Sequence, residues 1–473
     1  MGLYLNDIKN KPDVLFGVLI EIILSIIGCT SNDFEICSYI SFFQTVIAII
    51  VIARSGFGII SVPVFFVVLT YIFHCSQFIL YTLNIEYSVA FDIVDMVGIE
   101  ISQRLLTYYI ISVIFLTLGF LITTDRTYLF KKKDIFISFD FCSYIGKILM
   151  LLCFVPRFYL DISHFISYLI YGYEATYTNE AGLLLVWAYG FYIGALFYIL
   201  GSKFKKYHVL YVIIFSAYLL ITMICGRRLE QTGVLVILFI IYLRYCSRVK
   251  IKKTKLLVFA VLAYVFLAIV ATMGDMRYSL TFSFDSYWNV FLENLKGKLI
   301  TGQIAEFGDT GISLAYAIKC FPEDHPYHGG LTYIFAWMQV FPNIGGFVQK
   351  YFNTDIAFIT DIPSIYLKNF GCSFLGELYY NFGYFGTVAS LFIGFFIGKI
   401  CRRVEWSVNN KLNIKSMMYL AIMPTMITYV RGSFSDFVRI YIYYYIAVYS
   451  IYNLSTKYSK GYRIKNELSN RIG

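Results

Sequence analysis

Charged residues are scarce in this 473-residue sequence, where Asp, Glu, Lys and Arg together make up only 14%. A soluble domain carries about 25% charged residues. Proline is rare, and none of the ten cysteines forms the CxxC spacing that is typical of zinc sites and redox motifs. The composition therefore argues against a soluble globular domain. It offers no motif for a metal ion, and we expect no cofactor.

What the sequence has instead is apolar residues, 59% of the chain, gathered in long blocks. A helix needs about 20 residues to cross the bilayer core, and helices satisfy their own backbone hydrogen bonds there. An outer-membrane barrel would show short alternating segments instead. We predict an all-α, polytopic membrane bundle of about twelve transmembrane helices. The predicted spans lie near Val14–Cys29, Ile36–Ala53, Phe57–Leu83, Leu105–Thr123, Phe141–Pro156, Ala181–Leu200, Val209–Gly226, Thr232–Cys246, Leu256–Met273, Phe382–Gly398, Ser416–Val430 and Phe437–Leu454.

Basic residues gather in alternate connections between these blocks, as in Lys131–Lys133, Arg244–Lys255 and Arg402–Arg403. Cytoplasmic connections are enriched in Lys and Arg, so this pattern places both termini in the cytoplasm. The net charge of +10 then reflects membrane topology, and we expect no nucleic-acid partner. The predicted divisions are residues 1–273 with nine spans, a large outer loop at 274–381, three spans at 382–454 and a cytoplasmic tail at 455–473.

The predicted outer loop contains four of the eight prolines and two glycine pairs. Loops of this length are usually functional or disordered, and its aromatic content favours a folded loop. The amphipathic stretch Leu331–Phe341 is predicted to lie along the membrane surface. A disulfide between Cys320 and Cys372 stays open as an alternative to free thiols.

Arginine at the outer ends of spans runs against the topology rule and needs another reason. Arg227 and Arg228 follow one span, Arg277 follows another, and Arg431 ends a third. A guanidinium group binds phosphate oxygens with two parallel hydrogen bonds, and lipid diphosphate head groups lie at this depth. The alternative is an interfacial anchor or an ion pair with Glu230 or an outer carboxylate. Three further outer arginines belong to this group: Arg104, Arg157 and Arg439.

Several other polar residues are candidates for the chemistry. Glu377 opens an apolar helix, and a carboxylate at membrane depth is a candidate for proton transfer, with Asp309 as the second candidate. An ion pair between Glu377 and an outer arginine is the structural alternative. His328 is a candidate for contact with a sugar, whereas the spacing of the histidines is poor for a metal. Two charged residues inside spans, Glu21 and Lys147, are predicted to pair with each other.

The sequence resembles a known family in several segments, and the resemblance is strongest in Gly376–Gly383, which reads Gly-Glu-Leu-Tyr-Tyr-Asn-Phe-Gly. The other segments are Gly226–Arg228, Glu306–Asp309, Phe321–Glu323, Tyr327–Tyr333 and Phe341–Pro342. The sequence is similar to the O-antigen and capsule polymerases of the Wzy type over roughly Leu105 to Leu454. The resemblance implies a glycosyltransferase-C-like fold in the bacterial cytoplasmic (inner) membrane. It also implies glycan contacts by His328, Tyr379 and Asn381.

The resemblance implies that two undecaprenyl-diphosphate-linked oligosaccharides meet at the outer membrane face, within the surrounding lipid. A hydroxyl of one attacks the anomeric carbon of the other, and undecaprenyl diphosphate leaves. Arg227, Arg228, Arg277 and Arg431 would bind the diphosphate, and Glu377 or Asp309 would accept the proton. A chain-length regulator is an expected partner in lipopolysaccharide or capsule synthesis. An O-antigen ligase, a polyprenol-dependent glycosyltransferase and a lipid-linked oligosaccharide flippase or transporter remain alternatives.

Overall fold

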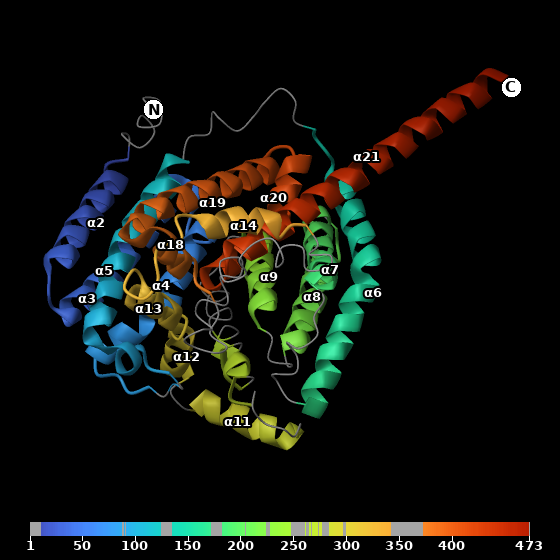
Figure 1. Ribbon diagram of the computed structural model, residues 1–473. Helices are drawn as coiled ribbons and strands as arrows, with labels where there is room; N and C mark the ends of the chain where they lie inside the picture. Colours follow the sequence, from blue (N-terminus) through green and yellow to red (C-terminus); the bar gives the residue numbers. More distant parts are fainter. Residues whose placement is uncertain are drawn as a thin grey trace.

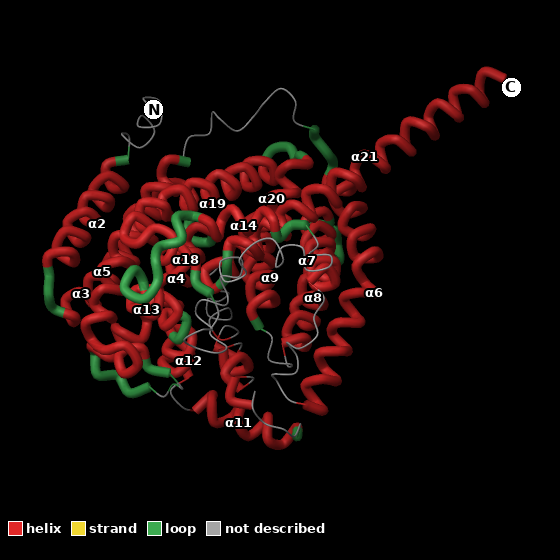
Figure 2. The backbone as a smooth tube through the Cα atoms, viewed as in Figure 1, coloured by secondary structure: helices red, strands yellow, loops and turns green. Residues whose placement is uncertain are grey.

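The computed structural model consists of helices throughout the part of the chain that it describes (Figure 1). That part comprises residues 11–87, 89, 91–123, 135–171, 182–203, 205–223, 228–246, 261, 264–265, 267–272, 274–276, 283–296, 299–341 and 372–472, with side chains up to residue 456. Within these ranges Figure 2 shows helices and loops but no strand, and a single β-bridge joins Phe136 to Asn413. The predicted all-α class is confirmed.

The elements follow one another along the chain from α2 to α21. In Figure 1, α2 and α3 lie at one edge of the body, α6 lies at the opposite edge, and α21 projects beyond it. Their bounds are α2 (Pro12–Thr30), α3 (Phe34–Ile52), η1 (Ala53–Phe57), α4 (Val62–Thr82), α5 (Ile93–Ile122), α6 (Phe139–Tyr171), α7 (Gly182–Gly201), α8 (His208–Thr222), α9 (Leu229–Ile240), η4 (Ile241–Cys246), α11 (Phe284–Lys296), α12 (Leu299–Gly308), α13 (Gly311–Cys320), α14 (Leu331–Met338), α18 (Phe374–Phe382), η7 (Gly383–Phe385), α19 (Gly386–Asn409), α20 (Ile414–Thr428), η8 (Tyr429–Arg431) and α21 (Phe434–Ile472).

Eight helical stretches among the described residues are long and apolar enough to cross a membrane, and α8 is a shorter apolar helix. Many large apolar side chains of α2 and α6 are exposed, as expected where a helix faces lipid rather than water. The chain is therefore a multi-pass membrane protein. The count of about twelve spans stays a prediction, and half of the predicted span Leu256–Met273 lies outside the described residues.

Helix α6 continues through Pro156, where the sequence predicted its end. Membrane helices tolerate an internal proline because neighbouring helices and side chains satisfy the freed carbonyl group. A helix of 33 residues is about 50 Å long, which exceeds the bilayer core of about 30 Å. Arg157 consequently lies inside α6 and is buried against its neighbours instead of lying at a span end.

Glycines allow two helix pairs to approach closely. A Cβ atom on Gly394 of α19 would collide with the carbonyl oxygen of Leu116 in α5. In the same way, a Cβ atom on Gly146 of α6 would lie 2.6 Å from the carbonyl oxygen of Gly194 in α7. Membrane helices associate through packing rather than through the hydrophobic effect, so small residues at a crossing are the expected stabilising feature.

Helices in the described part of the predicted outer loop pack on the membrane helices. α12 packs on α4, α13 packs on α4, α5 and α18, and α14 packs on α21. Helix α13 is almost wholly buried, and Cys320 at its end and Cys372 are buried free thiols, so no disulfide joins them. Leu331–Met338 forms helix α14 within the predicted amphipathic stretch. A large loop standing outside the bundle stays a prediction.

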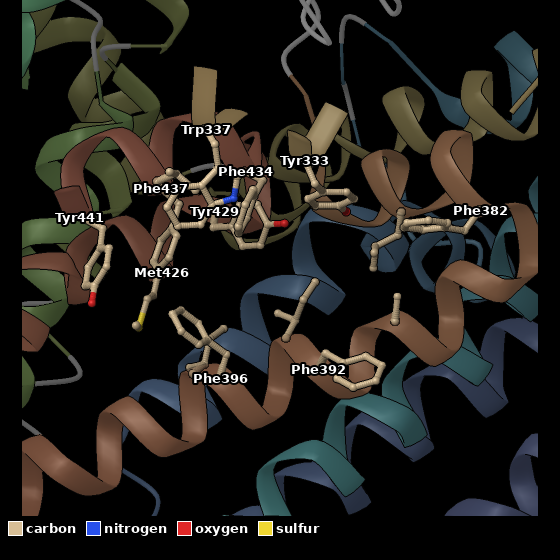
Figure 3. A pocket seen from close by; sticks show the side chains of 15 residues that line it. Tyr333, Trp337, Phe382, Phe392, Phe396, Met426, Tyr429, Phe434, Phe437 and Tyr441 are labelled. Carbon is tan, nitrogen blue, oxygen red and sulfur yellow. The ribbon is translucent and has the colours of Figure 1, made fainter. Parts of the chain in front are cut away.

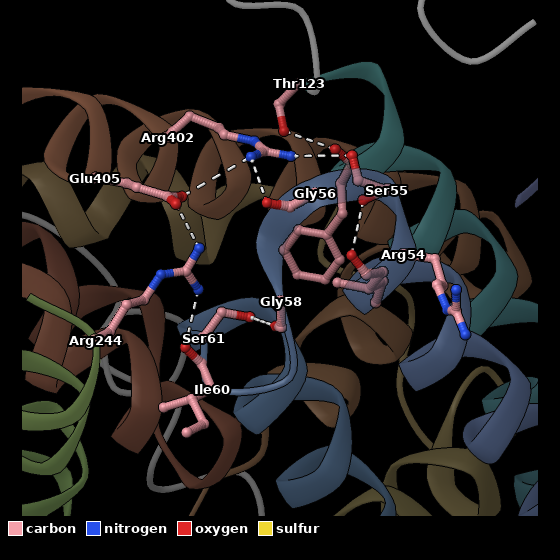
Figure 4. Close-up of polar contacts among 12 residues, drawn as sticks. Arg54, Ser55, Gly56, Gly58, Ile60, Ser61, Thr123, Arg244, Arg402 and Glu405 are labelled. Carbon is pink, nitrogen blue, oxygen red and sulfur yellow. Dashed lines mark hydrogen bonds and ion pairs between the residues drawn. The ribbon is translucent and has the colours of Figure 1, made fainter. Parts of the chain in front are cut away.

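One end of the bundle is held together by arginines (Figure 4). Arg402 of α19 donates to the carbonyl of Gly56 at 3.0 Å, in a turn where the φ of +115° favours glycine. Arg244 in η4 donates to the carbonyl of Ile60 at 2.9 Å and pairs with Glu405 of α19 at 2.5 Å. These contacts tie α19 and η4 to the connection between α3 and α4. We call this end the basic end.

The two charged residues predicted to pair inside the spans do not meet. Among the described ion pairs none joins Glu21 to Lys147, and α2 and α6 lie at opposite edges of the body (Figure 1). Lys147 instead lies over the ring of Tyr198, with its Nζ 5.6 Å from the ring centroid. Glu21 is fully buried between α2 and its neighbours. The predicted pair is wrong because α2 packs against α3 and α5 and not against α6.

Candidate functional site

Helices α9 and α20 pack on each other and run in opposite directions. The start of α20 lies at the basic end, where Ser416 donates to the carbonyl of Arg403, and the α9 stretch reaches the same end, where Arg244 pairs with Glu405. Gly233 of α9 packs so closely on α20 that a Cβ atom would lie 2.8 Å from the carbonyl oxygen of Pro424. Arg228 lies five residues before Gly233, and Arg431 lies seven residues after Pro424, so both extend past the crossing on the same side. The other end of α9 carries Arg244. Arg228 and Arg431 therefore lie opposite the basic end.

Arg228 immediately precedes α9 and is held by two described contacts. Its Nη2 pairs with Oε1 of Glu306 at 2.8 Å, and its Nη1 donates to the carbonyl of Val270 at 2.8 Å. Gln303 donates to the second oxygen of Glu306, also at 2.8 Å. The carboxylate that pairs with Arg228 thus comes from α12. An ion pair with an outer carboxylate was the alternative that the sequence analysis left open for this arginine. These contacts use two of the five N–H donors of the guanidinium group.

A second arginine lies at the same end of α9. Arg157 of α6 pairs with Asp161 one turn later, and its Nη1 is 3.9 Å from Oε2 of Glu230 in the first turn of α9. Its guanidinium group lies 4.6 Å from the ring centroid of Tyr192, a cation–π geometry. The Asp161 carboxylate also accepts a hydrogen bond from Tyr218 at 2.5 Å.

These groups line a cavity of about 350 Å³ between α6, α7, α8 and α9. The sequence reading placed Arg157 at a span edge and missed the cavity. The signal that could have found it is the i, i+4 spacing of Arg157 and Asp161, which puts both side chains on one face of a helix. The cavity combines one cation, two carboxylates and aromatic walls, which is a combination that can hold a polar ligand in a fixed orientation.

Asp309 lies in the turn between α12 and α13, three residues after Glu306. Its Oδ1 accepts a hydrogen bond from Gln77 of α4 at 2.8 Å. Gln77 also accepts from the backbone N–H of Ile93 at 2.9 Å, so this amide joins α4 to the starts of α5 and α13. The end of α12 therefore presents Glu306 towards Arg228, and the turn that follows presents Asp309 towards α4.

Glu377 is 0% exposed and lies in α18, whose N-cap is Ser373. Its Oε2 accepts from the backbone N–H of Phe434 at 2.8 Å, and its Oε1 accepts from the hydroxyl of Thr332 at 3.3 Å. Phe434 is the first residue of α21, whose first N–H groups have no partner inside the helix. Glu377 therefore caps α21, whose first residue lies three positions after Arg431. Among the described ion pairs none includes Glu377, so the predicted alternative of a pair with an outer arginine is not observed there.

Three predicted glycan contacts gather around the same α18 segment. Asn381 donates to Thr332 at 2.6 Å and accepts from the N–H of Gly330 at 3.0 Å. The backbone N–H of His328 donates to Tyr380 at 3.0 Å, while the ring atom Nε2 of His328 is buried without a hydrogen-bond partner. Burial, together with the charge of neighbouring His325, lowers the pKa of His328.

Tyr379 is buried, with its ring centroid 5.1 Å from that of Tyr108, in an aromatic cluster. The structure thus brings Glu377, Asn381, His328 and Arg431 into one region. Arg228 and Asp309 lie at a second place, the C-terminal end of α12, where Arg228 pairs with Glu306. Arg227 and Arg277 lie outside the described residues.

The fold and these clusters define an all-helical, multi-pass membrane protein with polar and charged groups gathered opposite its basic end. A comparison with protein families finds a match to the O-antigen polysaccharide polymerase Wzy over residues 14–460. The chain therefore belongs to the O-antigen polysaccharide polymerase Wzy family, as the sequence resemblance predicted, and the match extends beyond the Leu105–Leu454 region of that prediction. No curated protein and no solved structure matches the chain.

Proposed function

We propose that this protein joins undecaprenyl-diphosphate-linked oligosaccharide repeat units at the outer face of the bacterial cytoplasmic membrane. Membership of the O-antigen polymerase family supports polysaccharide polymerisation as the activity. The observation that carries the finer proposal is the position of Arg228 and Arg431 at the same end of the α9–α20 pair, close to acidic side chains and opposite the basic end. By the positive-inside rule, the basic end faces the cytoplasm.

In the proposed reaction, a sugar hydroxyl of the acceptor attacks the anomeric carbon of the donor. The new glycosidic bond forms from the hydroxyl oxygen. The bond from the anomeric carbon to the diphosphate breaks, and the electron pair leaves with undecaprenyl diphosphate. Negative charge therefore grows on the phosphate oxygens, and fixed guanidinium groups stabilise the transition state more than the ground state.

Arg228 is the principal candidate for this role, with Arg431 and the undescribed Arg227 and Arg277 as further candidates. The pair with Glu306 fixes the guanidinium group in position before substrate binds, and its unused N–H donors remain for phosphate oxygens. Preorganisation of this kind is what makes such donors effective in catalysis.

The acceptor hydroxyl must lose its proton during or after attack. Glu377 is our first candidate for the proton acceptor because it is a fully buried carboxylate near Arg431, and Asp309 is the second. His328, Tyr379 and Asn381 would contact the glycan. A chain-length regulator stays a predicted partner.

The test uses purified full-length protein reconstituted with lipid-linked repeat units. Arg228→Ala is expected to abolish polymerisation while the protein is still expressed, and Arg228→Lys is expected to be impaired because an ammonium group lacks the two-pronged geometry. The matched control is Glu306→Gln, which breaks the same ion pair but keeps the guanidinium group.

If Arg228 acts on the diphosphate, Glu306→Gln should lose part of the activity because the guanidinium group is held less firmly, but it should lose clearly less than Arg228→Ala. Equal loss in both variants would show that the ion pair is only structural. Products that carry several repeats on one lipid identify a polymerase, whereas transfer of a single block to a different acceptor would identify a ligase.

A further inference from the structure

An apolar groove of about 360 Å³ lies between α14, α18, α19, α20 and α21 (Figure 3). Aromatic side chains form most of its wall, and the lining is almost wholly apolar. The wall includes Trp337, Phe382, Phe392, Phe396, Phe434 and Phe437. Its volume falls in the range of about 300–1,000 Å³ that is typical of ligand pockets. Such a surface binds a hydrocarbon chain and offers almost no hydrogen bonds to the hydroxyl groups of a sugar.

The groove adjoins the polar groups around Glu377. The backbone N–H of Phe434 donates to Glu377, and the side chain of the same residue lines the groove. Tyr429, another lining residue, begins the turn that ends at Arg431. One short stretch of chain, from Tyr429 to Phe437, therefore presents an apolar wall on one side and charged groups beside it. An amphiphile with a polar head and an apolar chain matches this arrangement.

The groove also lies where lipid can reach it. Phe392 is 67% exposed and Phe396 is 42% exposed, and both belong to a helical stretch that is apolar and long enough to span the membrane. A chain that lies in the bilayer can therefore enter between these side chains without leaving the hydrocarbon region. No passage through water is needed.

We propose that this groove holds the isoprenoid units next to the diphosphate of the donor substrate. This inference rests on the proposed function. In the donor, only the diphosphate separates the chain from the reacting anomeric carbon. In the acceptor, a whole oligosaccharide also separates the chain from the attacking hydroxyl. Because the groove directly adjoins Glu377 and the turn that ends at Arg431, its occupant must carry its chain close to the reacting bond, and this is the donor.

The chain offers a matched pair of variants. Ala389 lines the groove, and Ala389→Trp fills part of it. Val388 directly precedes Ala389 on the same helix, is 42% exposed and does not line the groove, so Val388→Trp is the control. Ile393→Trp, one turn beyond Ala389, serves as a second filling variant, and thermal unfolding identifies which filled variants keep the fold.

The experiment measures photolabelling of the full-length protein in lipid nanodiscs, independently of turnover. The probe is a polyprenyl diphosphate sugar with a diazirine on an isoprene unit close to the diphosphate. We expect labelled peptides to include Phe392 or Phe396. A folded groove-filling variant should label roughly tenfold more weakly, which corresponds to about 1.4 kcal/mol, and Val388→Trp should label like the unaltered protein.

Several results would overturn the inference. One such result is equal labelling of the control and of the folded variants with a filled groove. Another is that excess ordinary phospholipid displaces the probe as effectively as unlabelled donor does. Labelling of the groove only by a probe built as an acceptor, with a phosphonate link that cannot leave, would exclude the donor. Specific donor labelling in the groove without polymer formation would support the groove while refuting the proposed polymerase activity.

Discussion

Replacement of Glu377 separates a structural role from a chemical one. This carboxylate is completely buried, caps the start of α21 through the N–H of Phe434 at 2.8 Å and accepts from Thr332 at 3.3 Å. Glu377→Gln keeps a carbonyl oxygen that can accept from Phe434. Glu377→Leu has similar bulk and removes both acceptors. Glu377→Gln therefore removes the acid group and keeps the cap, whereas Glu377→Leu removes both the acid group and the cap.

The hydrogen bonds set the expected loss of stability. Glu377→Leu leaves the partly buried backbone N–H of Phe434 without this partner, which costs up to about 3 kcal/mol, and the loss of the Thr332 contact adds about 1 kcal/mol. Glu377→Gln keeps an oxygen acceptor of nearly the same shape, and we expect a loss of about 1 kcal/mol or less. If the carboxylate accepts the proton, Glu377→Gln should still lower the polymerisation rate by about 10²–10⁴.

The assay combines thermal unfolding in detergent or nanodiscs with polymer formation from lipid-linked repeat units. The expected result is a near-normal unfolding temperature and little polymer for Glu377→Gln, with lower values of both for Glu377→Leu. Normal polymer from Glu377→Gln would refute a chemical role, and the cap alone would then explain why the side chain is buried there. In that case Asp309→Asn becomes the test of the second candidate.

Three further outcomes are expected from unfolding measurements. Gly394→Ala should destabilise the protein by about 1–3 kcal/mol because its Cβ collides with the α5 backbone, whereas Gly302→Ala, where a Cβ meets nothing within 4 Å, should not. Arg402→Met should cost about 1–3 kcal/mol through the carbonyl that it leaves unpaired, while the exposed Arg54→Met should change little. The lowered pKa of His328 means that protonation favours the unfolded chain. Its contribution to stability is therefore present above the ordinary pKa of about 6.5 and lost as the pH falls through that value, so His328→Phe should reduce the loss of stability in acid.

The membrane class and most helix positions follow from the sequence because apolar length alone decides them. Thr232–Cys246 was predicted as a span, and the structure has a continuous helical stretch over Leu229–Cys246. The end of α6 could not be predicted in the same way. A proline normally ends a helix in water, but buried partners around Arg157 and Asp161 sustain this helix beyond Pro156.

The composition of the candidate site follows from the sequence, whereas its pairings do not. Arg228, Glu377 and Asn381 stand out because polar residues at membrane depth are costly. Their partners come from distant segments: Glu306 lies 78 residues after Arg228, and Phe434 lies 57 residues after Glu377. No local spacing rule connects such residues. The one local pair in the cavity, Arg157 and Asp161, was hidden by the predicted helix end.

The two ends of one helix show how the bundle divides stability from chemistry. The helical stretch Leu229–Cys246 has 18 residues and a length of about 27 Å, close to the bilayer core of about 30 Å. An arginine stands near each end, and each pairs with a glutamate of another helix, Arg228 with Glu306 and Arg244 with Glu405. At the basic end the remaining guanidinium contacts go to backbone carbonyls, which fixes the connection between α3 and α4. At the opposite end Arg228 adjoins a turn with a second carboxylate, Asp309, and a polar cavity lies beside α9. An ion pair that served only to hold helices together would need no polar cavity beside it. This difference between the two ends favours our proposal that the diphosphate binds at the end opposite the basic end.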